Sequence, residues 1–139
     1  MPKTVNKKSV IRYTEAVGRR KTSVARVRIT PNSKQELVIN DQPFDRYFHI
    51  ADLQRIVVVP LALAPETGKG AISIHVRGGG IHSQAEAIAL GLARALIKVT
   101  PNLRQVMKQK KLLRRDPRMK ERRKFGLKKA RKAPQWSKR

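Results

Sequence analysis

Apolar and polar residues alternate most regularly in two stretches of the chain, 23–30 and 71–77. An alternation with period two is typical of a strand that has one buried and one exposed face. In both stretches one side consists of aliphatic residues and the other side carries arginine. The predicted inward positions are Ala25, Val27, Ile29, Ile72, Ile74 and Val76, and the outward arginines are Arg26, Arg28 and Arg77.

Two further strands are predicted from weaker patterns. Residues 10–17 alternate in part, and the basic stretch 18–21 that follows is expected to be the turn joining this strand to 23–30 in a hairpin. A short aliphatic run at 37–39 predicts another strand. The side of the first strand expected to face inward consists of Ile11, Tyr13 and Val17.

Helical spacing of apolar residues begins after the third strand. Residues 43–48 fit a single helical turn with Pro43 at its first position, and a longer helix begins at Ala51. Pro60 is expected to interrupt or kink this second helix, because proline lacks the amide hydrogen that the helix needs. The aromatic residues expected at the core or its rim are Phe44, Tyr47 and Phe48.

The longest predicted helix covers 84–99 and follows a run of three glycines. Ser83 and Glu86 have the spacing of a capping box at its start. Thr100 and Pro101 then predict another helix, with the threonine as N-cap and the proline at its first position.

This order of elements predicts an α+β fold with two layers, in which helices cover one face of a mixed, four-stranded sheet. We assign residues 1–113 to this globular domain, with 1–9 as a loose N-terminal segment. Residues 114–139 are assigned to an extended, basic C-terminal tail.

Charge changes the picture of that tail. It holds 13 Lys or Arg residues and two acidic residues, a formal charge of +11, within a chain of +24. Such a segment buries too little apolar surface to offset the entropy lost on ordering, so a dense array of negative charge must order it. A nucleic acid backbone is the leading candidate, and a merely solubilising tail is the alternative.

Several classes of function find little support in the sequence. The chain has no cysteine, no run long enough to span a membrane and no clustered carboxylates for a metal, so we expect no cofactor, no metal, no membrane partner and no enzymatic activity. The run Gly78–Gly80 resembles a dinucleotide loop, but the final glycine and the acidic residue are missing. A small ribonuclease using His75 and His82 remains a weak alternative, and a nucleic-acid-condensing protein without a fixed site remains another.

The glycine run and the basic residues are therefore interpreted as RNA contacts. Glycines let a phosphate approach the backbone, and arginine on a fixed strand binds phosphate oxygens in a fork. The candidate rRNA-binding residues are Arg19, Arg20, Lys21, Arg26, Arg28, Arg77, Gly78, Gly79, Gly80, Arg114, Arg115, Arg118, Arg122, Arg123, Lys124, Lys128, Lys129, Arg131 and Lys132.

Three separated motifs resemble one known family, that of the ninth protein of the small ribosomal subunit, bacterial type. They are the residues at 18–27, the glycine run with Gln84-Ala85 and 93–96, and the stretch 121–135 with the last three residues, 137–139. The chain departs from the family pattern at Ser83, where glycine is usual, and at Trp136, where Phe or Tyr is usual.

The resemblance implies a fold like the second domain of small-subunit ribosomal protein five, including an unusual left-handed crossover. It implies binding to rRNA in the head of the small subunit, beside neighbouring head proteins, in a bacterial cytoplasm or, as the alternative, a plastid. It also implies that the C-terminus contacts the anticodon stem-loop of the P-site tRNA. The residues carried over to that role are Ser137, Lys138 and Arg139.

Overall fold

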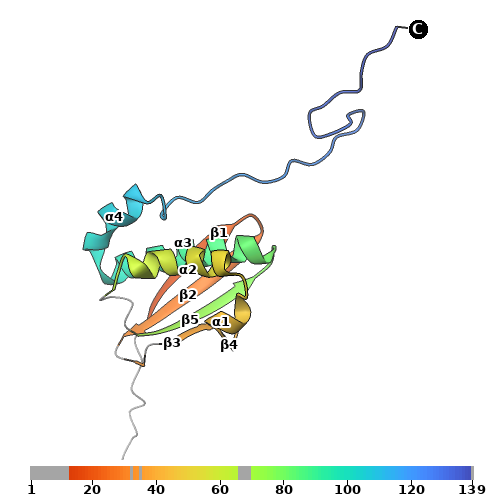
Figure 1. The fold of residues 1–139 in the computed structure, drawn as a ribbon. Coiled ribbons are helices and arrows are strands. Elements are labelled where there is room, and N and C mark those ends of the chain that lie inside the picture. The colour runs from red at the N-terminus through yellow and green to blue at the C-terminus, as the bar shows by residue number, and fades with distance from the viewer. Residues whose placement is uncertain (1–12, 32, 35, 66–69, 139) are drawn as a thin grey trace, which may run out of the picture.

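The computed structural model describes residues 13–31, 33–34, 36–65 and 70–138. A sheet forms one layer, and the helices α2 and α3 lie across one of its faces (Figure 1). This is the predicted α+β arrangement. The elements in chain order are β1 (Thr14–Arg20), β2 (Ser23–Pro31), β3 (Glu36–Ile39), β4 (Gln42–Pro43), α1 (Phe44–Tyr47), α2 (Ala51–Ala62), β5 (Gly70–Arg77), α3 (Ile81–Val99), the 3-10 helix η1 (Pro101–Leu103) and α4 (Arg104–Gln109).

The sheet is mixed, with strand order β1-β2-β5-β3-β4. Strands β3 and β5 are parallel and the other neighbouring pairs are antiparallel. The sheet has five strands and not the four predicted, because Asn40 and Asp41 adopt positive φ values of 45° and 63° and turn Gln42–Pro43 back beside β3. The chain passes from β3 to β5 through α1 and α2, and the left-handed course of this connection stays a prediction.

The strands differ in how well the sequence predicted them. In β2 and β5 the predicted inward residues are buried, with exposed fractions between 0% and 5%. In β1 the prediction was wrong in both extent and phase. The strand continues through Arg20, the turn is Lys21-Thr22 alone, and the inward residues are Ala16 and Gly18, while Tyr13 and Val17 are half exposed. Ile11 lies outside the described residues.

The phase of β1 follows from how closely α3 approaches it. A Cβ atom added to Gly18 would collide with the carbonyl oxygen of Ala87 and the amide nitrogen of Gly91. One added to Gly91 would come within 2.8 Å of a Val27 methyl and 3.2 Å of the Gly18 amide nitrogen. Because backbone meets backbone here, only residues without bulk fit. Gly18 is therefore a packing glycine within a strand, and not the turn residue that was predicted.

Helix α3 begins three residues earlier than predicted, at Ile81, with Gly80 as N-cap. Ser83 is the third residue of the helix and not its cap. Its hydroxyl accepts a hydrogen bond from the Gly80 amide at 3.1 Å and lies 2.7 Å from the Ser23 hydroxyl. The predicted capping box with Glu86 is wrong, since Glu86 binds an arginine of β1 instead.

The remaining helices agree more closely with the sequence. Helix α2 starts at Ala51 as predicted, but Pro60 is buried within it and the helix continues to Ala62. Pro43 is the N-cap of α1 and not its first helical residue. Among the aromatic residues, Phe48 is fully buried and contacts the rings of Phe44 and Tyr47 edge to face. The core thus lies between the sheet and α2–α3.

Two basic side chains of α3 reach over the outer edge of β1. Arg94 donates a hydrogen bond to the Val17 carbonyl at 2.8 Å, and Lys98 donates one to the Glu15 carbonyl at 2.7 Å. The backbone groups on this side of β1 point away from β2. The helix therefore satisfies carbonyls that the sheet itself leaves open.

Candidate nucleic-acid interface

The face of the sheet opposite the helices carries arginines from three neighbouring strands. The register places Arg26 of β2 between Val17 of β1 and His75 of β5, and Val24 between Arg19 and Arg77. Arg19, Arg26 and Arg77 are exposed. A shallow hollow on this side is lined by Val17, Val24, Arg26, Asn40, His75, Val76 and Arg77.

The spacing of the arginines on this face is suitable for binding phosphates. Neighbouring strands lie about 4.8 Å apart, so the arginines of three strands form a dense cationic surface on a rigid support. The exposed His75 on the same face offers an additional hydrogen-bond donor. The sequence correctly identified Arg26 and Arg77 as outward, because β2 and β5 alternate regularly, whereas it placed Arg19 in a turn.

Arg28 shares that face but is already engaged. Its Nε donates to the Glu15 carboxylate at 2.7 Å, and its guanidinium lies 4.7 Å from the centre of the Tyr13 ring. The hydrogen bond with Glu15 raises the pKa of Arg28 above its ordinary value. A phosphate at Arg28 would have to compete with Glu15, so this arginine is less available than Arg26 beside it.

Arg20 lies on the other side of the sheet from Arg19. Because Arg20 belongs to a strand and not to a turn, successive side chains point to opposite faces, and Arg20 points toward α3. Its side chain is only 12% exposed. Its Nε lies 2.6 Å from Glu86, its Nη2 lies 3.3 Å from Asp116 and its Nη1 donates to the Arg118 carbonyl at 2.6 Å.

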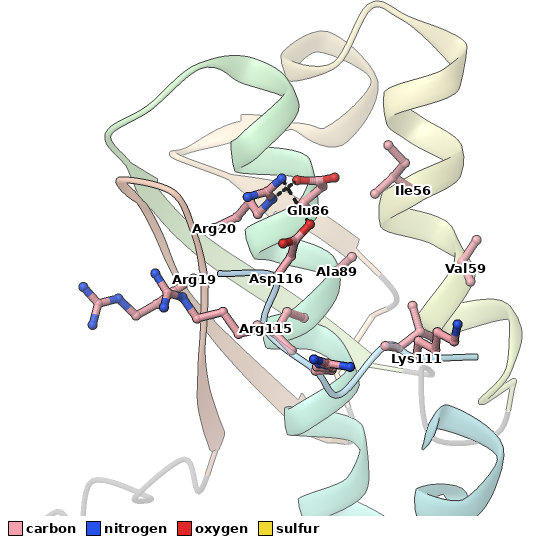
Figure 2. Close-up of a pocket in the computed structure, with 12 residues that line it drawn as sticks. Arg19, Arg20, Ile56, Val59, Glu86, Ala89, Lys111, Arg115 and Asp116 are labelled. Atoms are coloured by element: carbon pink, nitrogen blue, oxygen red, sulfur yellow. Dashed lines mark hydrogen bonds and ion pairs between the residues drawn. The ribbon is translucent and has the colours of Figure 1, made fainter. Parts of the chain in front are cut away.

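Figure 2 shows this cluster in a pocket beneath the start of the tail, with Arg20, Glu86 and Asp116 pointing toward one another. The apolar side of the pocket comes from α2 and α3, and basic residues stand at its rim. Sequence reasoning missed the cluster because it placed Arg20 in a turn. The lining residues are Arg19, Arg20, Ile56, Val59, Glu86, Ala89, Leu90, Lys111, Leu112, Arg114, Arg115 and Asp116.

The three glycines between β5 and α3 divide into two kinds. Gly78 and Gly79 have φ values of +78° and +65°, and added Cβ atoms would collide with the Thr22 carbonyl and with the hydroxyls of Ser23 and Ser83. These two are required by the local fold. Gly80 has nothing within 4 Å of its Cβ position.

The loop that these glycines form is held firmly. Both the Ser23 hydroxyl and the Gln84 side-chain amide donate to the Gly78 carbonyl, at 2.9 and 3.1 Å. All three glycines are exposed, and the free space beside Gly80 adjoins the exposed residues Ile81 and His82. A phosphate contact there stays a prediction.

The chain contains neither helix nor strand in the described residues 110–138, and it extends away from the body (Figure 1). Its acidic residues organise it locally. Glu121 accepts hydrogen bonds from Lys124 at 2.8 Å and Arg131 at 2.7 Å, which lower its pKa. The predicted rRNA-binding residues that are exposed in this part are Arg114, Arg115, Arg118, Arg122, Arg123, Lys124, Lys128, Lys129, Arg131 and Lys132.

Two aromatic rings stand among these cations. Phe125 is fully exposed and Trp136 is 79% exposed, so neither belongs to a core. Exposed rings beside arginine and lysine are typical of segments that stack on bases. Ser137 and Lys138, the predicted tRNA contacts, are exposed as well, whereas Arg139 lies outside the described residues.

Among the described residues no group of three or more His, Asp or Glu residues is placed to hold a metal ion. No helix in the same part of the chain is long and apolar enough to cross a membrane.

A compact α+β body with an arginine-rich open sheet face and an extended cationic tail defines a protein of the RNA-binding class. The chain matches the family model of ribosomal protein S9/S16 over residues 18–139 and belongs to that family. It is therefore a structural protein of the small ribosomal subunit that binds RNA in translation, with rRNA and other ribosomal proteins as partners. The family resemblance of the sequence motifs is confirmed.

Proposed function

We propose that this protein binds rRNA in the head of the small subunit and that the end of its tail contacts the anticodon stem-loop of the P-site tRNA. The body would dock through Arg19, Lys21, Arg26 and Arg77, and the tail would pass between rRNA segments. Ser137, Lys138 and Arg139 would form the tRNA contact. A bacterial cytoplasmic ribosome, with a plastid ribosome as the alternative, belongs to the same proposal.

The observation that carries this proposal is the contrast between body and tail. The body buries a continuous core, whereas residues 119–138 are almost entirely exposed and contact no element of the body in any hydrogen bond described. A fully extended segment of this length spans about 65–70 Å. The tail therefore has the reach to act at a site remote from the docked body.

The division at residue 113 between body and tail stays a prediction. Beyond residue 118, the cations of 120–132 supply charge that is partly interchangeable, because phosphate neutralisation depends on the number of cations more than on their order. Residues 133–138 interrupt the charge run with Pro134 and Trp136, which favours a defined contact at the end.

The test is to remove Ser137–Arg139 and to compare the result with a variant that loses two cations elsewhere, Lys128→Ala with Lys129→Ala. In reconstituted small subunits we expect normal assembly for both. P-site tRNA affinity, measured by filter binding, should fall about fivefold for the truncation, as one lost charge-assisted contact of about 1 kcal/mol implies, and clearly less for the control. Equal tRNA affinity in truncated and full-length subunits would refute the tRNA contact.

The rRNA contact has its own measurement. Affinity for head rRNA should fall steeply with salt concentration, and the Lys128/Lys129 variant should show a smaller salt slope by about 1–2 released counterions. A slope that does not change in this variant would contradict phosphate binding by these two lysines.

A further inference from the structure

The tail root, defined as residues 114–118, is tied to the body by side chains that composition alone would not single out. Arg20 binds Glu86, Asp116 and the Arg118 carbonyl with three different nitrogen atoms. These acceptors come from α3 and from two points of the tail root. We call Arg20, Glu86 and Asp116 the root clasp.

The clasp differs from an ordinary surface ion pair in its geometry. Arg20 is 12% exposed and the carboxylates of Asp116 and Glu86 are 30% and 35% exposed, so water reaches the cluster only in part. One of the three contacts is a hydrogen bond to a backbone carbonyl, so Arg20 holds the main chain as well as side chains. Lysine has a single nitrogen and could not reach all three acceptors at once.

Asp116 also shapes the tail root from within. Its carboxylate accepts a hydrogen bond from the Arg118 amide at 2.9 Å, and the Arg118 guanidinium binds it at 2.8 Å. The side chain thus bends the backbone across two residues, as Asx turns do. The same carboxylate faces Arg20 (Figure 2), so Asp116 takes part both in the bend and in the contact with β1.

We propose that the root clasp positions the tail, so that Arg20, Glu86 and Asp116 act as positioning residues for whatever the tail binds. The importance of this role for tRNA binding rests on the proposed function above. Arg20 would then be a residue that aims the tail, and not the phosphate contact that the sequence suggested. Asp116, an acidic residue in a basic segment, would be required because of its negative charge.

Direction matters more than length here. If the clasp opens, about 25 residues are free where about 20 were, which by length alone dilutes the tail end only about 1.4-fold. A loss of tRNA affinity greater than this would therefore indicate that the tail has lost its direction.

The most informative variant is Asp116→Asn, because two explanations predict opposite changes in the affinity for RNA. The substitution raises the net charge of the protein by one. If the tail acts through total charge alone, RNA binding should stay equal or become tighter. If the clasp positions the tail, P-site tRNA affinity should fall, and we expect at least about threefold.

Arg20→Lys and Arg19→Lys form a matched pair on adjacent residues. Both keep the charge, but only Arg20 contacts the tail root. Arg20→Lys should loosen the root, and Arg19→Lys should not. Neither Asp116→Asn nor Arg20→Lys removes a core side chain, and urea unfolding of each variant checks that the body still folds.

The direction of the tail can be measured in the free protein. The chain has no cysteine, so Ser73→Cys on β5 and Met119→Cys just beyond the clasp provide two unique spin labels. Double electron–electron resonance should give a narrow distance distribution for the parent chain and for Arg19→Lys. It should give a broad one for Asp116→Asn and Arg20→Lys.

The outcomes separate the clasp from the proposed function. Narrow distributions in Asp116→Asn and Arg20→Lys would overturn the clasp, whatever the tRNA affinities are. Broad distributions with unchanged tRNA affinity, while removal of Ser137–Arg139 lowers it, would overturn positioning and leave the tRNA contact standing. If that removal has no effect, the tRNA contact fails, and the distance distributions alone decide whether the clasp directs the tail.

Discussion

Gly18→Ala adds a single methyl group at the closest contact that the structure shows for any described glycine. The added Cβ would collide with the carbonyl of Ala87 and the amide of Gly91. Both obstacles are backbone atoms of α3, so no side chain can rotate away, and the helix itself has to move off the sheet. Gly18 has no positive φ, so alanine suits its backbone conformation and any loss of stability comes from packing.

The magnitude follows from the cost of overpacking a core. We expect a loss of about 3 kcal/mol in the free energy of unfolding, at the upper end of the usual range, because the contact is rigid on both sides. For a body of this size that corresponds to a fall of about 10–20 °C in the melting temperature. If Gly18 instead lay at an uncrowded position, the same change would stabilise the protein by about 0.4–1 kcal/mol through the unfolded state.

Urea unfolding of the free protein, followed by circular dichroism, measures this difference. Gly80→Ala is the matched control, because its added Cβ has open space and its φ of −100° suits alanine. We expect that control to lie within about 0.5 kcal/mol of the parent chain. If Gly18→Ala were as stable as Gly80→Ala, the close contact between β1 and α3 would be refuted.

Two further predictions concern smaller effects. Ser83→Ala removes both the bond to the Gly80 amide and one of the two partners of the buried Ser23 hydroxyl, and should cost about 1–2 kcal/mol in urea unfolding, whereas Ser73→Ala on the exposed face should cost less than 0.5 kcal/mol. The second concerns acid. The Arg118 side chain and amide hold the pKa of Asp116 well below its usual range, so its stabilising contribution is fully present above about pH 4 and is lost only as pH falls through the lower folded-state pKa. The label distances at the tail root should therefore be the same at pH 7 and pH 4, and broadening between pH 6 and pH 4 would contradict this.

The fold was predictable where hydropathy carries the signal. Strands β2 and β5 alternate inward aliphatic residues with mostly polar outward residues, so both their existence and their phase could be predicted. In β1 the inward residues are Ala16 and Gly18, which are small and give only a weak hydrophobic signal. The half-exposed Val17 suggested the opposite phase. The contact that selects glycine there is made by α3, distant in sequence, and a local pattern does not contain it.

The residues of the candidate interface also differ in whether the sequence could predict their surroundings. Exposure of Arg26 and Arg77 follows from the alternation of their strands. The engagement of Arg20 and of Arg28 depends on acidic residues that become neighbours only in the folded chain. Asp116 was counted as one negative charge among many positive ones, and a count of charges does not reveal that this carboxylate binds an arginine of β1.

The two edges of the sheet affect how the free protein behaves before it binds RNA. An open strand edge is a template on which a second chain can add a strand, and this is a common start of aggregation. On one side, Arg94 and Lys98 occupy the outward carbonyls of β1. On the other, the last strand is two residues long and ends in Pro43, which has no amide hydrogen to offer. Both edges thus resist self-pairing, which keeps a newly made chain available for assembly.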